Sequence, residues 1–278
     1  MLPRVGHIKY LNCFPLYYGL VKNMQLDDME LISGVPVELN NSILNETLDI
    51  SPISSIEYYR NKDKYLLFPN LTVSSSGHVR SVILFSKVPI DELHNEKVAL
   101  VSSSSTSHVL LRIILKYRYG IEPEYISCKP DLDLMLNEAN AALLIGDKAL
   151  EESINRTDLY AYDLGEEWHK FSGKKMVYAL WCVRKSFAKE NPEIVKRVLD
   201  ALLKSSDYCK DNLKEVVKNA SCWDKFDADF IENYLSDLSF YLDQEAQDGL
   251  NYFSELAKES GWLKQNGSLV FFDHEETA

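Results

Sequence analysis

The chain has 278 residues, of which 46% are hydrophobic and 26% are charged, and its formal net charge is −12 at pH 7. This composition is ordinary for a globular protein, and the length suits two lobes that share one α/β plan. No apolar run approaches the roughly 20 residues of a membrane-spanning helix, so no membrane is expected. Residues 224–278 carry 13 Asp and Glu against 3 Lys. Without a basic stripe to neutralise phosphates, nucleic acid is not an expected partner.

The N-terminal segment MLPRVGHIKYLNC alternates like a strand and lacks the apolar core of a signal peptide. The five cysteines are odd in number, widely spaced and form no CxxC pair, which indicates reduced thiols. We therefore expect a cytoplasmic protein. No HxxxH spacing, GxSxG elbow or phosphate-binding glycine loop occurs, so neither a metal nor a nucleotide cofactor is expected.

Three segments of the first half, and a fourth just beyond it, share one design: an apolar β-type run, a small polar cluster and a helix-type run. Strands that alternate with helices in this way predict a parallel α/β architecture. The four strands are expected at 5–10, 47–50, 98–101 and 141–145, and the helices at 16–21, 56–60, 109–119 with a stop at Gly120, and directly after Gly146 and Asp147.

Two long apolar strands, 80–86 and 176–184, are interpreted as crossings between two lobes. Lobe one then comprises residues 1–87 and 178–278, and lobe two comprises 88–177. This discontinuous plan predicts an α/β, two-lobed periplasmic-binding-protein-like (type II) fold with a central cleft. We expect the lobes to close over a ligand about the segments 86–89 and 173–177.

An amphipathic helix is expected over 188–208, because apolar residues recur there at helical spacing. Asn191 is its expected cap and Pro192 its first residue. Residues 224–262 are interpreted as further helix with a stop at Gly261.

Polar clusters follow the predicted strands, at the edge where α/β proteins bind their ligands. Each cluster also opens a helix, whose free amides and positive dipole end favour negative charge. Several such helix starts predict an anion site that needs no basic residue. Ser and Thr at these places also serve simply as caps, and Asp147 suits a cap as well as a ligand contact. The candidate binding residues are Tyr10, Ser54, Ser55, Ser75, Ser76, Ser105, Thr106, Ser107 and Asp147.

Asn12, in the first strand-to-helix turn, is the catalytic candidate, although an Asn there also makes ordinary turn bonds. Cys13 follows it near a helix start, where a thiol is sometimes activated, but a packed and inert cysteine is more common.

An ordered set of motifs runs from about Val5 to Tyr208 and includes VGHIKYLNCFPLYYGL, GVPVELN, LDISPISSIEYYRN, SVILFSKVPIDEL, KVALVSSSSTS, AALLIGDKAL, YDLGEEW and MVYALWCVRKSF. Together these motifs resemble the chorismate dehydratase family of the futalosine route to menaquinone. The family's Tyr-Leu-Asn, Ser-Pro-Ile-Ser-Ser and Ser-x-Thr-Ser match residues 10–12, 51–55 and 104–107. Residues 76–80 depart from the family pattern, because they carry His78 and Arg80.

The resemblance implies a lyase that dehydrates chorismate to 3-[(1-carboxyvinyl)oxy]benzoate without a cofactor. It implies that the small-molecule substrate is a dianion, which suits paired helix starts. No strong base occupies the motifs, which leaves two hypotheses: Asn12 orients the reacting groups, or the substrate's own side-chain carboxylate takes the proton. The alternative functions are a non-catalytic solute-binding protein and the ligand-sensing domain of a regulator, each for a small carboxylate.

Overall fold

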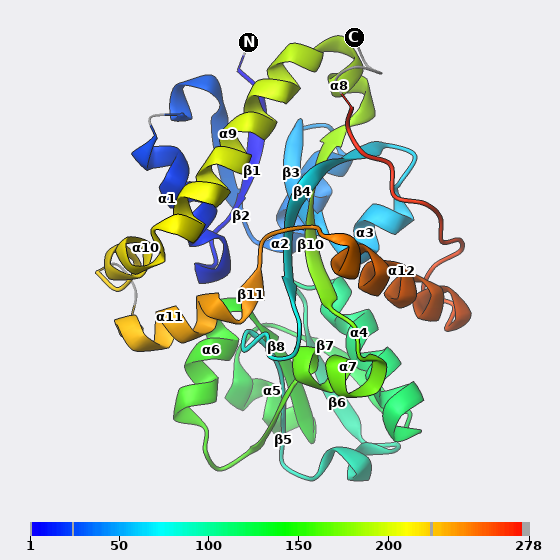
Figure 1. Cartoon of the computed structure of the whole chain (residues 1–278). Coiled ribbons are helices and arrows are strands. Elements are labelled where there is room, and N and C mark those ends of the chain that lie inside the picture. Colours follow the sequence, from blue (N-terminus) through cyan, green and yellow to red (C-terminus); the bar gives the residue numbers. More distant parts are fainter. Residues whose placement is uncertain (1, 24, 223–224, 274–278) are drawn as a thin grey trace. The chain divides into compact units, whose positions relative to one another are not determined.

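The structure is a computed structural model that describes residues 2–23, 25–222 and 225–273, and the chain forms two compact units (Figure 1). The first unit comprises Met1–Val73, Tyr178–Asp243 and Gly267–Ala278, and the second comprises Ser74–Val177 and Gln244–Asn266. The sequence-based division assigned 74–87 and 244–266 to lobe one, whereas their contacts in the structure lie within the second unit.

The first unit is built on a six-stranded mixed sheet with the order β11-β4-β10-β3-β1-β2. Strand β1 runs parallel to both β2 and β3, whereas β3 pairs antiparallel with β10. The strands are β1 (Arg4–Ile8), β2 (Glu30–Gly34), β3 (Ile50–Ser54), β4 (Tyr65–Ser75), β10 (Met176–Arg184) and β11 (Leu238–Ser239).

The helices and turns of this unit include a pair, α1 and α9, that lie side by side (Figure 1). A Cβ atom on Gly19 of α1 would lie 2.2 Å from Ser205 Oγ of α9, so glycine allows the close approach. The segments are η1 (Leu11–Cys13), α1 (Phe14–Lys22), η2 (Leu26–Asp28), α2 (Pro36–Leu44), α3 (Ser55–Arg60), α8 (Lys185–Glu190), α9 (Pro192–Asp211), α10 (Leu213–Ala220) and α11 (Ala228–Ser236).

The amphipathic helix predicted around residues 188–208 is confirmed as α9, and its apolar stripe is buried at Val195, Val198 and Leu202. Pro192 is its first residue, as expected. Asn191 does not cap α9 with its side chain; its Nδ2 instead donates to the carbonyl of Phe187, 3.3 Å away in α8. Asn191 therefore separates two helices where the sequence predicted one.

A buried ion cluster joins the amino end of β1, the residue before β3 and the carboxyl end of β10. Asp49 is 3% exposed and accepts hydrogen bonds from Arg4 Nε (3.0 Å), Arg4 Nη2 (2.7 Å) and Arg184 Nη2 (2.7 Å). Burial works against the carboxylate, but the hydrogen bonds from both arginines outweigh it and hold the pKa of Asp49 below its ordinary value.

The second unit is built on a five-stranded mixed sheet with the order β7-β6-β8-β5-β9. Strand β6 is parallel to β7 and β8, and β5 is antiparallel to β8 and β9. The strands are β5 (Val82–Ser86), β6 (Lys97–Val101), β7 (Glu124–Cys128), β8 (Ala141–Ile145) and β9 (Tyr160–Asp163).

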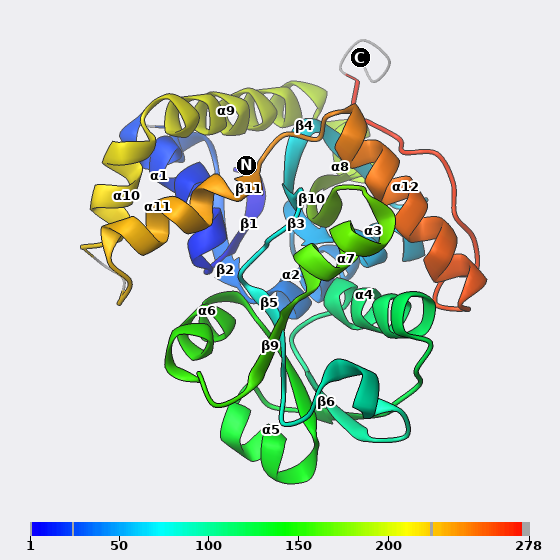
Figure 2. The ribbon, with the colours of Figure 1, turned by 60° about the horizontal axis from the view of Figure 1, so that its bottom comes forward.

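Helices α4, α7 and α12 lie together within the second unit (Figure 2). Arg112 of α4 contributes to this packing, because its guanidinium stacks between the rings of Tyr125 and Trp262, at 4.1 and 4.2 Å from their centroids. The helical segments are η3 (Ile90–Leu93), α4 (Thr106–Ile114), the π-helical turn η4 (Leu115–Tyr119), α5 (Leu132–Glu138), α6 (Gly146–Asn155), α7 (Leu164–Ser172) and α12 (Gln244–Glu259).

Two predicted elements differ from the structure. The strand expected at 47–50 lies further along the chain, because β3 spans Ile50–Ser54 and its backbone pairs with β10 along its whole length. The helical remainder expected over 224–262 is interrupted by β11, which pairs with β4 at the edge of the sheet. The predicted stops are confirmed: Gly120 and Gly261 have φ of 69° and 79°.

In the described part of the chain, no helix has both the length and the apolar character to cross a bilayer. All five cysteines lie in this part and are free thiols.

Candidate functional site

Polar side chains of the first unit gather where β1 and β3 end. These two strands are parallel neighbours, so their carboxyl ends share one edge of the sheet. Strand β1 leads into η1, which carries Asn12 and continues directly into α1, and β3 ends on Ser54 and leads into α3. We call Tyr10, Asn12, Ser54 and Ser55 the first-unit cluster.

Asn12 has an unused hydrogen-bond acceptor. Its Oδ1 is buried and has no hydrogen-bond partner among the described residues. A buried amide oxygen without a partner costs free energy, and native proteins seldom leave one in place without a reason. A turn-forming Asn would use this oxygen to accept from a nearby backbone N–H. The Oδ1 of Asn12 makes no such turn bond among the described residues.

Ser54 is held by a partner that the sequence analysis did not identify. Asn40 of α2 donates from Nδ2 to Ser54 Oγ (3.1 Å), and its Oδ1 accepts from the backbone N of Ser54 (3.0 Å). Ser54 occupies the cap position of α3 but makes no side-chain cap bond. Its hydroxyl thus accepts from Asn40 and keeps its hydrogen for a second partner. The motif GVPVELN contains Asn40, but its spacing carries no signal for this contact.

The other members of this region are more enclosed. Ser55 is fully buried in the first turn of α3, and Tyr10 is half-buried, with its carbonyl accepting from Cys13 N (2.9 Å). Cys13 is 1% exposed, which fits the packed cysteine better than an activated thiol. The ring of His7 in β1 contacts that of Tyr17 at a tilt of 43°, with centroids 3.8 Å apart. Burial, with help from nearby Lys9, lowers the pKa of His7.

In the second unit, the parallel strands β6 and β8 place the starts of α4 and α6 at one edge of the sheet. We call Ser105, Thr106, Ser107 and Asp147 the second-unit cluster. Thr106 and Ser107 are 3% and 5% exposed in the first turn of α4, and Ser105 precedes it without making a side-chain cap bond. Ser105 therefore does not serve as the cap that sequence reasoning allowed. Asp147 lies in the first turn of α6, whose cap position is held by Ile145.

Ser75 and Ser76 lie at and just beyond the end of β4. Ser75 is buried and donates from Oγ to the carbonyl of Gly77 (3.1 Å), whereas Ser76 is exposed. Gly77 has a φ of 111°, which only glycine adopts readily. The pair therefore belongs to a tight turn, with Ser75 used to hold it.

Asp163, which is not among the predicted site residues, organises the loop that follows Ser75 and Ser76. Its carboxylate accepts from the backbone N of Val79 (3.1 Å) and Arg80 (2.6 Å) and also caps α7 through Gly165 N and Glu166 N. Arg80 has a φ of 54°, a strained value for a non-glycine residue. The Asp followed three residues later by Glu166 is a helix-start signature that sequence reasoning overlooked.

Burial raises the pKa of Asp163, although the backbone N–H groups of Val79, Arg80 and Glu166 act in the opposite direction. His78 lies beside this carboxylate, with Nδ1 3.7 Å from Asp163 Oδ2 and Nε2 3.8 Å from Glu166 Oε1. His78 thus lies beside the carboxylate that holds the loop, and Arg80 is held by it through its backbone N–H. The amide of Ser81 is bound locally, and its carbonyl accepts from Gly146 N (2.8 Å), which ties the loop to the start of α6.

Each cluster offers neutral donors and a helix start, and neither contains Lys or Arg among the residues that define it. Such groups suit the oxygen atoms of a carboxylate. Within residues 2–23, 25–222 and 225–273, no group of three or more His, Cys, Asp or Glu side chains is arranged to hold a metal ion.

Two mixed sheets, each with its own helices, and polar helix starts at the strand ends define the class of periplasmic-binding-protein-like α/β folds. Solved structures agree: an Archaeoglobus fulgidus protein matches with a TM-score of 0.76 at 18% identity, covering 94% of this chain and 98% of that one. The aliphatic sulphonate-binding protein of Escherichia coli matches with a TM-score of 0.66 at 12% identity, covering 98% and 94%. At these identities the likeness concerns the fold, and the fold class expected from the sequence is confirmed.

The chain belongs to the menaquinone biosynthesis family, whose model matches residues 3–259. A chorismate dehydratase of Thermus thermophilus is 28% identical over 266 residues, which cover 90% of this chain and 93% of that protein. A chorismate dehydratase of Campylobacter jejuni is 29% identical over 185 residues, covering 65% and 67%. The resemblance to chorismate dehydratases expected from the motifs is thereby confirmed.

Proposed function

We propose that this protein is a chorismate dehydratase, a lyase that converts chorismate to 3-[(1-carboxyvinyl)oxy]benzoate and water in menaquinone biosynthesis. The proposal is supported by membership of the family and by relatives that carry this name. One observation on the chain itself carries the proposal. Asn12 lies shortly after β1, within the most recognisable motif, and its buried Oδ1 has no partner among the described residues.

The reaction breaks the C–H bond at the ether-bearing ring carbon and the C–O bond of the neighbouring hydroxyl. The electron pair of the C–H bond becomes a ring double bond, the hydroxyl leaves, and the proton and hydroxyl together account for one water. The ring becomes aromatic, which supplies driving force. Modest help from positioned groups, on the order of 10²–10⁴-fold each, then suffices.

Asn12 suits this chemistry because an amide both donates and accepts. Its Nδ2 donates to the departing hydroxyl oxygen, and its Oδ1 accepts from a protonated oxygen of the substrate. The proton itself goes to the substrate's side-chain carboxylate, or to a water that Asn12 orients. Neither route asks for a strong base from the chain.

The ring carboxylate is conjugated with the carbon that loses its proton, so negative charge spreads into it as the bond breaks. Hydroxyl and amide donors aimed at this carboxylate stabilise the transition state. We assign this role to Ser54 and Ser55 with Tyr10 in the first unit. The candidates of the second unit are the hydroxyl groups of Ser75, Ser76, Ser105, Thr106 and Ser107 and the backbone N–H of Asp147 at the start of α6. The five free thiols suit a reducing compartment, so the cytoplasm is the proposed location.

The test is to mix purified protein with chorismate and to follow ultraviolet absorbance and mass. We expect an aromatic product one water lighter than chorismate, formed equally well after treatment with a chelator. Binding of chorismate without any product would instead indicate a solute-binding or ligand-sensing protein. Loss of activity on chelation, with recovery on adding a metal, would contradict the cofactor-free reaction.

A further inference from the structure

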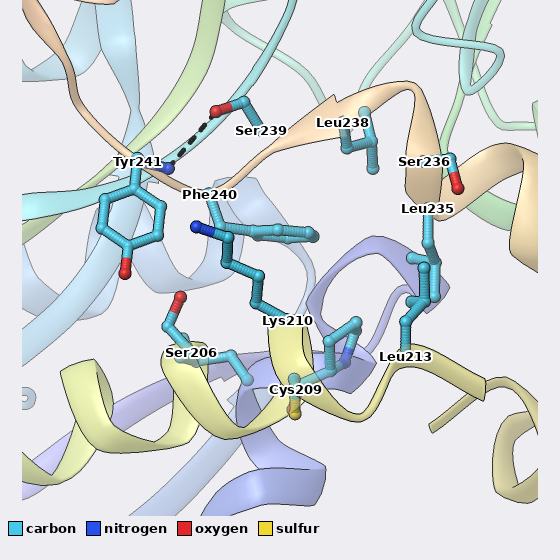
Figure 3. Close-up of a pocket in the computed structure, with 12 residues that line it drawn as sticks. Ser206, Cys209, Lys210, Leu213, Leu235, Ser236, Leu238, Ser239, Phe240 and Tyr241 are labelled. Carbon is cyan, nitrogen blue, oxygen red and sulfur yellow. Dashed lines mark hydrogen bonds between the residues drawn. The ribbon is translucent and has the colours of Figure 1, made fainter. Parts of the chain in front are cut away.

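A concave site lies wholly within the first unit and shares no residue with the first-unit cluster (Figure 3). Its volume is about 340 Å³, within the range of sites that hold small molecules. It is lined by Pro15, Leu16, Ser206, Cys209, Lys210, Leu213, Leu235, Ser236, Leu238, Ser239, Phe240 and Tyr241.

The lining has the chemistry of a site for an amphipathic molecule. Leu213 and Leu235 lie together at one end, and Phe240 lies on the side of the β11 segment, facing Lys210 of α9 (Figure 3). Lys210 Nζ lies 5.3 Å from the centroid of the Tyr241 ring, which holds the ammonium at the end away from the two leucines. Lys210 is the charged side chain of this lining, and the nearby Asp207, outside the lining, accepts a hydrogen bond from the Tyr241 hydroxyl. An apolar body with an ammonium group at its end suits a ring-bearing compound that carries a single carboxylate.

The pocket wall is fastened to the helix that continues from Asn12. Cys209 Sγ, in the pocket lining, donates to the carbonyl of Pro15 (2.6 Å), and Ser205 Oγ donates to the carbonyl of Leu16. These bonds hold the first turn of α1 on α9. Because η1 runs directly into α1, a ligand that presses on Pro15 and Leu16 acts on the segment that carries Asn12.

We infer that this pocket is an effector site for a small aromatic monocarboxylate, separate from the residues assigned to the substrate. The ring occupies the space between Leu213, Leu235 and Phe240, and the carboxylate pairs with Lys210. Occupation displaces Asn12 from its productive position and lowers kcat, because small misplacements of a catalytic group cost rate. Binding of the monocarboxylate in this pocket does not depend on the proposed function, whereas the expected fall in kcat rests on it.

The test uses 1-naphthoate as the probe and 1-naphthylmethanol as its uncharged counterpart, with binding measured by titration calorimetry on the full chain. Ser236→Trp fills the pocket from its exposed rim, and we expect the Kd of naphthoate to rise at least about tenfold. Lys210→Gln should raise it by about two- to fivefold and leave the alcohol unaffected. Asn233→Trp and Lys204→Gln are exposed controls on the same two helices, outside the pocket, and should bind like the parent protein.

Turnover of chorismate is then measured with increasing naphthoate. We expect kcat to fall with little change in KM, and Ser236→Trp to be insensitive. Equal binding in Ser236→Trp and Asn233→Trp, or no binding at millimolar probe, would overturn the site. Simple competition with chorismate that persists in Ser236→Trp would also overturn it, because the probe would then occupy the substrate's site. Normal binding behaviour in a protein that does not turn over chorismate would support the pocket and refute the proposed enzyme.

Discussion

Asn12 and Ser54 of the first unit differ from Ser75 of the second unit in the hydrogen-bonding capacity that they leave unused. The Oδ1 of Asn12 has no partner among the described residues, and Ser54 accepts from Asn40 while keeping its hydroxyl hydrogen. Ser75, by contrast, spends its hydroxyl on the carbonyl of Gly77. We therefore expect substrate contacts at polar side chains that still have an unused hydrogen-bond donor or acceptor.

Replacing Asn12 by Ala separates catalysis from stability. We expect turnover of chorismate to fall by about 10²-fold or more, as it does when a well-placed transition-state donor is lost. The melting temperature should stay the same or rise slightly, because the substitution removes a buried acceptor that has no partner. Steady-state kinetics and thermal unfolding check the two parts. Asn41→Ala, at an exposed position of α2, is the control. Near-normal turnover, or a variant that fails to fold, would make Asn12 a structural residue.

Ser54 and Asn40 are expected to act as one unit in binding the substrate. Ser54→Ala should raise KM for chorismate by about tenfold, the effect of losing one hydrogen bond to a charged group. Asn40→Asp should have a similar effect, since a carboxylate would accept from Ser54 Oγ and draw its hydrogen away from the substrate.

The double variant, with Ser54→Ala and Asn40→Asp together, should have a KM no higher than that of either single variant, because both changes remove the same interaction. Kinetics on the three variants give the coupling directly. Additive effects on KM would contradict the idea that Asn40 works through Ser54.

At the scale of elements, the strands of the first unit are held together at the edge opposite the first-unit cluster. Arg4 begins β1, Asp49 precedes β3 and Arg184 ends β10, and their side chains meet in one buried cluster. Loss of the Asp49 charge takes the shared counter-charge away from two partly exposed guanidinium groups, although Arg184 keeps Glu46 and the carbonyl of Leu48 as partners.

Asp49→Asn should lower the free energy of unfolding by about 3 kcal/mol at pH 7, measured with urea. The pKa of Asp49 is below its ordinary value in the folded state, so the unfolded chain takes up the proton first as the pH falls. The stabilisation is therefore fully present above pH 5, about one unit above the ordinary pKa, and declines as the pH falls through the folded pKa. The difference in free energy of unfolding between the parent protein and Asp49→Asn should become smaller below about pH 4. Asp27→Asn, at an exposed residue of η2, should show no such change. A difference that is constant from pH 7 to pH 3 would argue against the cluster.

At the scale of the whole molecule, the path of the chain couples the two units. The chain passes from one unit to the other after Val73, Val177, Asp243 and Asn266. Neither unit is therefore a continuous segment, and each needs distant parts of the sequence to complete its sheet or its packing. We infer that they fold and unfold as one cooperative system.

The reactivity of the cysteine thiols measures whether the two units unfold together. Cys128 reports on the second unit, and Cys13, Cys182 and Cys209 report on the first. Burial raises the pKa of Cys182, and that of Cys209 to about 12, and partial burial together with Glu138 raises the pKa of half-buried Cys128, so these thiols should react more slowly than an exposed one.

Exposed Cys222 should react at once with a disulfide reagent, and Cys222→Ser should remove this rapid phase. In urea, Cys128 and Cys182 should become reactive at the same midpoint, as seen by mass mapping. Separate midpoints for the two would contradict a single cooperative transition.

The sequence by itself determined the fold class, the family resemblance, the long helix with its first proline, and the two glycine stops. These features follow from local rules: helical spacing of apolar residues, the fixed φ of proline, and the left-handed conformation that glycine tolerates.

Tertiary structure alone decided the rest, because it depends on partners that are distant in the chain. Pairing with β10 made 51–54 a strand, although their Ser and Pro content is that of a polar cluster after a strand. Asn40 reached Ser54 through the packing of α2 on β3, and β11 was formed by a neighbour strand far away in sequence. Asp163 accepts hydrogen bonds from the amides of Val79 and Arg80, which lie more than 80 residues away in the sequence. A hydrogen bond between such residues has no periodicity or spacing to signal it, because folding, and not the local chain, brings the two groups together.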